Sequence, residues 1–581
     1  MSFLRKYVRK YGKMFSLAVL FLMLEAFCDL LQPTIMSKVI DDGVATGSMN
    51  KVFALGGFML FVTGIGALSA TIRNIVSSHV SQRFGAEFRS DLFRQIQSLS
   101  FEHMDRFDRA SLVTRLTNDV TQVQNFMNGL MRFFVKAPLL GLGALIMALR
   151  LDLHLSVVLI VVVPIVAVLI LLNMKIGFPF FIRVQRALDR VNGVMREYLS
   201  GVRVVKAFNR FDYEVDKFGA ANDDLAQRST TSMRVMSAFG PGISLVVNFG
   251  IIAVLWLGGL RVDNNQMQVG SIIAFINYMT QILFALMMIS NVFNMFVRAK
   301  ASAGRIGEVM AEKSGMPGEG ADKAPEAAER GRIDFEDVGF AYAESAGDPV
   351  IRGFTLTCLP GQTIGIIGST GAGKTSLVHL IPRFYDATSG RVKVNGVDVR
   401  EMDPKKLRET IAIVPQKIML FTGTVEDNLR WGKEEASEEE LIRAARMAEA
   451  HEFIMASPEG YGSRIGQGGV NFSGGQKQRL SIARALVRQP EILILDDCTS
   501  AVDVATEGRI KEALRTYAKG LTCILIAQRI TSVMDADRIV VMDRGEIAGS
   551  GTHEELMQDC RVYQEIYKSQ MGKEMQPNAA E

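Results

Sequence analysis

Six long runs of apolar residues dominate the first 300 positions of the chain. They lie at about 15–37, 52–76, 129–149, 154–174, 239–260 and 269–297. A helix needs about 20 mostly apolar residues to cross the hydrocarbon core of a bilayer, and each run meets that requirement. The pattern therefore predicts six transmembrane helices.

The connections between these runs are short after the first, third and fifth, and long after the second and fourth. The long ones, roughly 77–128 and 175–238, are rich in charged residues and in helix formers. We expect the helices to continue about 20 Å or more beyond the membrane. Five basic residues and no acid lie in the first 13 positions, so we expect a cytoplasmic N-terminus, an uncleaved first span and long connections inside the cell.

The pattern changes beyond residue 300. Positions 313–330 are rich in Gly, Ala, Glu and Pro, as is typical of a linker. After them, short apolar runs alternate with helical segments, which favours an α/β domain. We expect a transmembrane domain at 1–312, a linker at 313–330 and a soluble domain at 331–581.

The composition and charge of the chain also indicate that its two halves are different kinds of domain. A mean hydropathy of +0.18 with 22% charged residues excludes a disordered chain, a coiled coil and a purely intramembrane protein. Residues 1–300 carry 31 Lys and Arg against 19 Asp and Glu, a net of +12, which leaves 34 against 42, a net of −8, for the rest. We assign the basic excess to cytoplasmic loops and expect no nucleic-acid partner.

Five scattered cysteines without a CxxC spacing argue against a disulfide framework and against a zinc site. They are Cys28, Cys358, Cys498, Cys523 and Cys560. We expect buried free thiols in a reducing compartment.

Several spans contain polar residues that allow two interpretations. Glu25 and Asp29 are four positions apart and share one face of the first helix. The sixth run carries Asn277, Gln281, Asn291 and Asn294 between methionines. These residues can form a polar, adaptable wall for a substrate. Alternatively, they bond between helices, the acids pairing with a base such as Lys136.

A phosphate-binding loop follows an apolar strand at 363–367. Its sequence fits GxxxxGK[ST], and a helix start follows it, which is the context that this motif requires. Backbone N–H groups would surround phosphate oxygens of ATP, Lys374 would reach the β- and γ-phosphates, and the Thr375 hydroxyl would ligate Mg²⁺. The expected nucleotide-binding residues here are Gly368, Ser369, Thr370, Gly371, Ala372, Gly373, Lys374, Thr375 and Ser376.

A second apolar strand, at 492–495, ends in two carboxylates. This is typical of a Walker B element. Asp496 would hold the Mg²⁺, and Asp497 would stand beside the attacking water.

Between these motifs, Ser473, Gly474, Gly475 and Gln476 match the signature of ATP-binding-cassette (ABC) proteins. The set continues with Tyr342 as the aromatic that stacks on adenine, Gln416 as the Q-loop that also serves Mg²⁺, Ser500–Asp503 as the D-loop, and Gly466–Gly469 as an X-loop with Gln467 in place of the usual acid. The resemblance covers nearly the whole chain. Six spans before one cassette resemble an ABC exporter half-transporter.

That resemblance implies a polytopic α-helical membrane domain followed by an α/β P-loop cassette. Two cassettes would meet head to tail, each ATP lying between the P-loop of one chain and the signature of the other. Coupling helices would lie at about 100–115 and 197–210, and alternating access would follow.

Two positions depart from the family pattern. Asp497 stands where active members have Glu, and Gln528 stands where they have the H-loop His. The aspartate is one methylene shorter, and a glutamine cannot become cationic. We expect this site to bind ATP and to hydrolyse it poorly. The chain would then pair with a second half-transporter that supplies Glu and His at these positions.

The sequence thus favours a subunit of a heterodimeric, multidrug-type exporter of small hydrophobic or amphipathic compounds in a bacterial plasma membrane, with its cassette in the cytoplasm. A lipid or peptide exporter is the alternative within transport. Because the first span starts near residue 15, we expect no N-terminal protease domain of the kind found in peptide-processing exporters. An ATP-gated regulatory or channel-like protein is the alternative outside transport.

Overall fold

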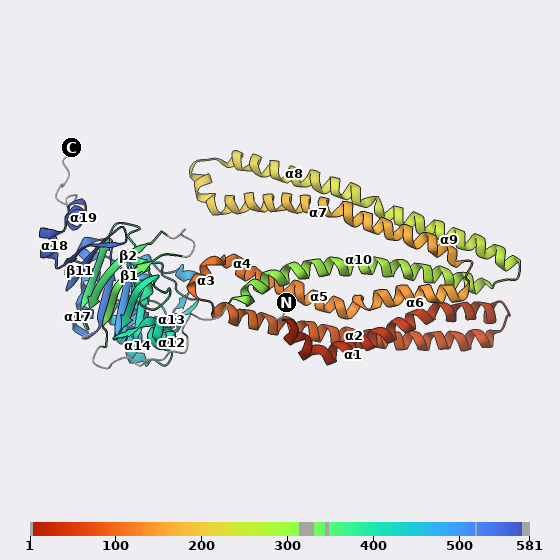
Figure 1. Ribbon diagram of the computed structural model, residues 1–581, viewed down its shortest axis with the longest axis horizontal. Coiled ribbons are helices and arrows are strands. Elements are labelled where there is room, and N and C mark those ends of the chain that lie inside the picture. The colour runs from red at the N-terminus through yellow and green to blue at the C-terminus, as the bar shows by residue number, and fades with distance from the viewer. Residues whose placement is uncertain (1–3, 313–329, 343–347, 518–519, 572–581) are drawn as a thin grey trace. The chain divides into compact units, whose positions relative to one another are not determined.

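The computed structural model describes residues 4–312, 330–342, 348–517 and 520–571 (Figure 1). The chain forms two compact units. One comprises Met1–Gln97 and Arg109–Glu312, and the other comprises Ser98–Asp108 and Lys313–Glu581. Except for Arg330, the predicted linker lies outside the described residues.

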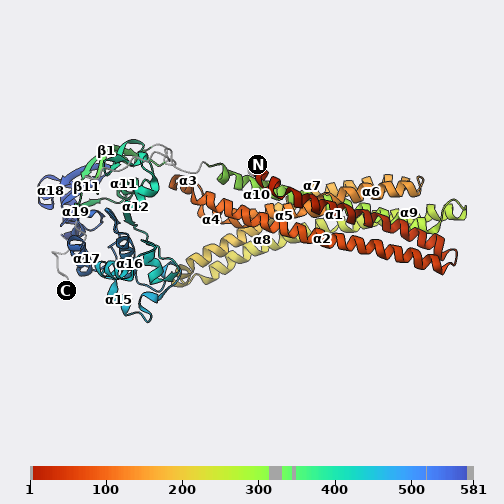
Figure 2. The same cartoon turned by 90° about the horizontal axis from the view of Figure 1, so that it is seen from below.

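The first unit consists of long helices, and α7 and α8 run side by side in both Figure 1 and Figure 2. Within the described residues, six stretches are long and apolar enough to cross a membrane, and each overlaps one of the six predicted runs, so the prediction of six spans is confirmed. The helices are α1 (Leu4–Lys38), α2 (Met49–Gln97), α4 (Arg109–Thr114), α5 (Val120–Gly129), α6 (Lys136–Leu151), α7 (Ser156–Ala207), α8 (Phe211–Ser237), α9 (Phe239–Asp263) and α10 (Val269–Ala311).

Three π-helical segments interrupt these helices: η1 (Val39–Val44), η2 (Arg115–Asp119) and η3 (Leu130–Phe134). A buried apolar core joins α6, α7, α9 and α10. The predicted extension of the spans is also present. The 52 residues of α7 correspond to about 78 Å of helix, against about 30 Å of hydrocarbon core.

Of the two expected coupling helices, the first is present as a separate helix and the second is not. A short helix, α3 (Phe101–Arg106), forms in the first connection, and the Ser100 hydroxyl caps it by accepting from the backbone N–H of His103. In the second connection, α7 runs unbroken to Ala207 and the chain turns into α8 at Phe211. Residues 197–210, all described, therefore form a helix end and a turn and no separate helix. Asn209 takes the positive φ that this turn requires.

The second unit contains three sheets. The four-stranded sheet has the order β2-β1-β4-β5, the six-stranded sheet the order β12-β11-β3-β10-β9-β6, and β7 pairs with β8. The strands are β1 (Ile333–Phe340), β2 (Ile351–Cys358), β3 (Thr363–Gly368), β4 (Ser389–Val394), β5 (Val397–Asp398), β6 (Ile411–Val414), β7 (Gly423–Thr424), β8 (Arg464–Ile465), β9 (Ile492–Asp496), β10 (Thr522–Ile526), β11 (Arg538–Asp543) and β12 (Glu546–Gly551).

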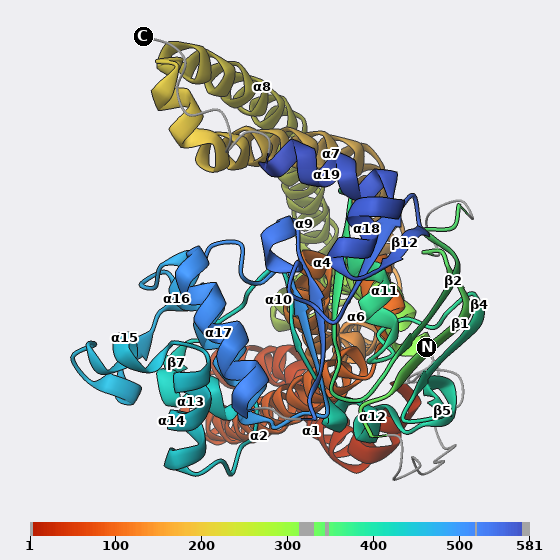
Figure 3. The ribbon, with the colours of Figure 1, turned by 90° about the vertical axis from the view of Figure 1, so that its left-hand side faces the viewer.

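Helices flank these sheets. Figure 3 shows α13 to α16 gathered on one side of this unit and the β1–β2–β4 strands on the other. The helices are α11 (Lys374–Leu380), α12 (Pro404–Thr410), α13 (Val425–Arg430), α14 (Glu438–Met447), α15 (His451–Met455), α16 (Gly474–Val487), α17 (Val504–Tyr517), α18 (His553–Asp559) and α19 (Arg561–Met571). One buried core lies between the two large sheets, and a second packs α13, α14 and α16 against the six-stranded sheet.

Candidate functional site

The six-stranded sheet brings four predicted segments to one edge. Strands β3, β10, β9 and β6 are parallel neighbours in that order. The predicted residues follow the carboxyl ends of these strands: the phosphate-binding loop after β3, Gln528 after β10, Asp496 at the end of β9 and Gln416 after β6. In open α/β sheets this edge is where ligands bind.

The loop from Gly368 to Gly373 turns sharply into α11. Gly371 and Gly373 have φ values of +84° and +91°, which side chains rarely adopt. A Cβ at position 373 would also lie 2.9 Å from the Val350 carbonyl oxygen. Glycine is therefore required at 373 for both space and conformation.

Lys374 and Asp496 lie buried and close to each other. The Lys374 ammonium donates to the carbonyl oxygens of Gly368 (2.9 Å) and Ser369 (2.8 Å). Burial lowers the pKa of Lys374, and the charges of Asp497 and Asp496 oppose this shift. Asp496 is 1% exposed, and burial raises its pKa, with a further rise from the charge of Asp497. The Thr375 hydroxyl donates to Asp496 Oδ1 at 3.2 Å.

The two residues that depart from the family pattern contact each other. The Gln528 side-chain amide donates to Asp497 Oδ2 at 2.6 Å, and the Gln416 amide donates to the same oxygen at 3.2 Å. Asp497 has a φ of +48°, and its N–H donates to the Ile526 carbonyl at 2.9 Å. Two neutral amides thus hold the carboxylate that would face the attacking water.

Tyr342 belongs to an aromatic cluster that reaches α3. Its hydroxyl bonds the Ser376 hydroxyl at 2.9 Å, and its ring meets Tyr385 edge-on at 5.3 Å. The Tyr385 hydroxyl donates to Asp105 of α3 at 2.7 Å, and Phe101 of α3 packs on Phe384 at 4.5 Å. Burial, followed by this hydrogen bond, raises the pKa of Tyr385.

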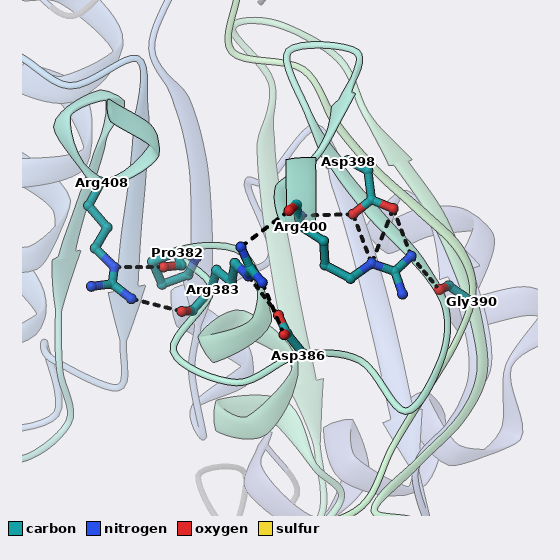
Figure 4. Close-up of polar contacts among 7 residues, drawn as sticks. All are labelled: Pro382, Arg383, Asp386, Gly390, Asp398, Arg400 and Arg408. Carbon is teal, nitrogen blue, oxygen red and sulfur yellow. Dashed lines mark hydrogen bonds and ion pairs between the residues drawn. The ribbon is translucent and has the colours of Figure 1, made fainter. Parts of the chain in front are cut away.

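Two arginines, the buried Arg383 and the half-buried Arg408, hold the segment that carries Phe384 and Tyr385 (Figure 4). Arg383 is fully buried and pairs with Asp386, and its Nη1 donates to the Arg400 carbonyl. Arg408 donates to the carbonyl oxygens of Pro382 (3.0 Å) and Arg383 (2.8 Å). The docking surface for α3 is therefore a fixed part of the cassette.

The predicted signature forms the N-terminus of α16. Ser473 Oγ accepts from the Gln476 N–H, and Gln476 Oε1 accepts from the Ser473 N–H, so the two residues make a capping box. Gly475 lies against the D-loop, because a Cβ there would be 2.9 Å from the Ala501 carbonyl oxygen. In the predicted X-loop, the Gly468 carbonyl accepts from Lys477 at 3.1 Å. Among the described residues, no hydrogen bond or ion pair joins the signature to Lys374, Thr375 or Asp496.

In the first unit, the two acids of α1 belong to an ion-pair cluster. Glu25 is 6% exposed and accepts from Arg73 of α2 at 2.7 Å and from Lys136 of α6 at 2.5 Å. Lys136 also pairs with the more exposed Asp29 at 2.9 Å. The pairing with Lys136 that the sequence offered as an alternative is present.

The polar residues of α10 separate into two groups. Gln281 turns toward α1, where its amide donates to the Asp29 carbonyl at 3.1 Å. Asn277, Asn291 and Asn294 are exposed, and Asn277 bonds the Ile273 carbonyl of its own helix. The structure therefore does not bring the four residues into one cluster.

Comparison with known families agrees with this arrangement. Residues 15–286 match the family model for an ABC transporter transmembrane region, and residues 351–500 match the model for an ABC transporter. A Bacillus subtilis (strain 168) protein named "Uncharacterized ABC transporter ATP-binding protein YfiB" is 39% identical over 98% of both chains. The chain belongs to the ABC transporter family.

Other relatives of this ABC transporter chain carry functional names. A "Fatty acid ABC transporter ATP-binding/permease protein" of Mycobacterium bovis is 32% identical over 94% of the chain and 84% of that protein. A "Mitochondrial potassium channel ATP-binding subunit" of Rattus norvegicus is 33% identical over 88% and 72%. A solved bacterial Atm1-family ABC exporter with ATP bound superposes with a TM-score of 0.80 at 23% identity over 100% and 99% of the chains, which shows the fold. The fold and the six apolar helices are those of a multi-pass membrane protein.

Sequence reasoning missed several residues of this transporter. Arg73 lies in an apolar run, and the sequence did not predict it as a partner of Glu25. Asp105 and Tyr385 were also missed, although the aromatic pair at 384–385 shortly after the P-loop helix was a usable signal.

Proposed function

We propose that this chain is one subunit of a heterodimeric ABC exporter that uses ATP to move hydrophobic or amphipathic compounds across a bacterial plasma membrane, with its N-terminus and cassette in the cytoplasm. The observation that carries the proposal is the contact of Gln528 with Asp497 beside an otherwise complete P-loop. Such a site retains what binding ATP requires and lacks what fast hydrolysis requires.

The proposed binding roles follow from position and chemistry. Lys374 neutralises the β- and γ-phosphates, and Tyr342 stacks on adenine. The Thr375 hydroxyl and the Asp496 carboxylate, 3.2 Å apart, are hard oxygen donors that suit Mg²⁺, with Gln416 as a further ligand. Mg²⁺ would neutralise charge on the phosphates. The signature at Ser473 would complete the ATP site of the partner subunit.

The proposed slow hydrolysis has two physical causes. The side chain of Asp497 is one methylene shorter than glutamate, and an error of about 1 Å in placing a catalytic group can cost about 100-fold in rate. Gln528 can hydrogen-bond the γ-phosphate but cannot take up a positive charge. We therefore assign most hydrolysis to the site that carries the partner's P-loop.

The substrate path is proposed to follow α10. Asn277, Asn291 and Asn294 stay exposed on that helix in the described chain, and Met287 is exposed with them. Exposed polar groups and flexible methionines suit amphipathic compounds of varied shape. Asp29 and Gln281 remain candidate contacts for the substrate. Glu25 is a weaker candidate, because it already pairs with Arg73 and Lys136. The mycobacterial relative named for fatty acids favours lipid-like substrates within this class.

A second candidate function is ATP-gated regulation of a passive pathway. It is favoured by the ATP site, which carries Asp497 and Gln528 in place of Glu and His, and by the rat relative whose name describes a channel subunit. The two candidates differ in whether ATP hydrolysis drives accumulation against a gradient.

The test reconstitutes the chain with its partner in inside-out vesicles. ATP-dependent uptake of an amphipathic dye against its gradient is expected, together with a change of less than about twofold in ATPase activity for Asp497→Asn. Uptake that only equalises the dye concentrations would favour the gated pathway. A loss of ATPase activity in Asp497→Asn as large as that caused by removing the partner's catalytic Glu would disprove the degenerate site.

A further inference from the structure

An aromatic pocket lies in the first unit, away from the polar residues of α10. It has a volume of about 400 Å³, and all of its lining residues are apolar. Five phenylalanines dominate it: Phe126 of α5, Phe133 and Phe134 of η3, and Phe293 and Phe296 of α10. Four of these rings, at 133, 134, 293 and 296, are at least 40% exposed in the chain.

Local backbone features create this pocket. The segment Leu130–Phe134 is π-helical, a conformation that is rare and occurs frequently at functional sites. Just before it, Gly129 allows α10 to come close, because a Cβ at this position would lie 2.7 Å from Met295 Cε. Phe126 and Phe296 pack with their ring centroids 5.7 Å apart. Packing between α5 and α10 thus holds the rings in place, while four of them keep an exposed face.

A lysine stands at one end of the pocket. Ile289, Phe293, Phe296 and Lys300 follow the i, i+4, i+7, i+11 spacing of one helix face. Lys300 is therefore one turn, about 6 Å along the axis, beyond Phe296, toward the end at which α10 leaves the predicted span. Its side chain is exposed, and no ion pair or hydrogen bond of its ammonium occurs within the described part of the chain. Arg298 falls on another face, in line with Asn291 and Asn294.

We propose that this pocket binds the tail of a single-chain anionic amphiphile taken from the cytoplasmic leaflet, and that Lys300 pairs with its headgroup. An apolar tail toward the membrane centre and a cation at the cytoplasmic end match the orientation of a lipid in that leaflet. The volume is near the lower end of the roughly 300–1,000 Å³ of small-molecule sites, which suits one chain rather than two.

The inference rests on the proposed function for its orientation and for the fate of the ligand. It adds a binding site on α10 that is separate from the exposed Asn277, Asn291 and Asn294. The apolar lining would bind the tail by burying its surface, and Lys300 would favour an anion over its neutral ester.

The first experiment measures binding without nucleotide, so that it does not depend on transport. The full-length chain with its partner, in detergent, is titrated with the fluorescent fatty acid cis-parinaric acid and with its methyl ester. Phe293→Ala and Phe134→Ala are expected to weaken both ligands about tenfold, as expected for the loss of buried apolar area. Lys300→Gln is expected to weaken the acid roughly fivefold and to leave the ester unchanged, whereas Lys300→Arg retains binding.

Matched controls lie on the same helix. Phe284→Ala removes an exposed ring outside the pocket, and Arg298→Gln removes a cation from another face. Both are expected to bind the acid like the unmodified complex. If these controls weaken binding more than Phe293→Ala and Lys300→Gln do, the amphiphile lies along the face of α10 that carries Asn291 and Asn294, and the pocket proposal is wrong.

A second experiment locates the ligand directly and does not rely on truncating a side chain. In Phe293→Trp, 12-bromostearic acid is expected to quench the introduced tryptophan, and in Phe284→Trp it is not. Absence of quenching at 293 would mean that another part of the complex fills the pocket, and it would overturn the inference. Binding and quenching without ATP-driven uptake would instead contradict the proposed export function alone.

Discussion

At the scale of single residues, two adjacent carboxylates have opposite environments. Asp496 ends a central strand, is almost completely buried, and has a raised pKa because burial disfavours its charge. Asp497 leaves the sheet with a positive φ and accepts bonds from two amides. The two roles expected from the motif, a metal ligand at Asp496 and a group beside the attacking water at Asp497, stay predictions that these different environments allow.

The environment of Asp496 predicts a pH-dependent cost. Its raised pKa means that the folded protein binds the proton more tightly than the unfolded chain does, so stability falls as pH rises from the ordinary value near 3.8 through the raised value. Asp496→Asn removes this cost. We expect the variant without nucleotide to melt at a higher temperature than the unmodified protein at pH 7.5, because the cost of the buried charge is removed. Thermal scans from acid pH, near the ordinary pKa of 3.8, up to pH 8 measure the difference, which should shrink toward acid pH.

The same variant should lose the stabilisation by Mg²⁺ and ATP. A melting temperature below that of the unmodified protein at pH 7.5, or an undiminished Mg²⁺ effect, would contradict this account of the carboxylate.

At the scale of elements, one residue at the start of α16 has an observed structural role and a proposed functional role. The hydroxyl of Ser473 caps the helix, and Ser473 is also the first residue of the predicted signature. A second capping box in the cassette, Ser437 with Glu440 at the start of α14, has the same chemistry without the motif. The pair allows the capping contribution to be measured separately.

Replacing either serine by alanine should cost about 0.5–2 kcal/mol of stability through the lost cap. Only Ser473→Ala should also reduce the ATPase activity of the complex, by tenfold or more, because this hydroxyl would face the nucleotide of the partner subunit. Melting temperature and ATPase activity are measured for both variants. Equal losses of activity would mean that Ser473 acts through the cap alone.

At the scale of the whole molecule, the proposed function assigns the P-loop and the signature of this chain to two different ATP sites. The P-loop edge and the signature are both formed, yet no hydrogen bond or ion pair connects them among the described residues. Under the proposed function, the 581 residues make one of the two subunits of a working transporter, and the activity of each ATP site depends on which residues each subunit supplies.

Restoring the family residues should convert the weak site into an active one. In the double variant Asp497→Glu with Gln528→His, the longer side chain brings the carboxylate closer to the attacking water, and the imidazole can become positively charged. We expect vanadate trapping of labelled ADP on this chain, in the complex with its partner, to rise about 10- to 100-fold. The single variants serve as controls and should give smaller increases. Unchanged trapping in the double variant would show that the impairment has another origin.

Much of the fold could be predicted because its signals are local. An apolar run of about 20 residues is visible in sequence, and the six spans followed from it. The glycines and the lysine of the P-loop are fixed by spacing within one turn, so their position after β3 was predictable as well. The expected helix at 197–210 is a counterexample. The family pattern suggested a separate helix, but the backbone hydrogen bonds of α7 continue to Ala207.

The sequence by itself determined the elements, the motifs and the two substituted positions, because each depends on neighbours a few residues away. Only the tertiary structure decided which side chains meet. Glu25 and Arg73 are 48 residues apart, Asp105 and Tyr385 are 280 apart, and Gln528 and Asp497 are 31 apart. Such contacts arise from the packing of whole helices and from the order of strands in a sheet. The aromatic pocket has the same origin, because its rings come from the consecutive segments α5 and η3 and from α10, which is distant from them in the chain and adjacent only after folding.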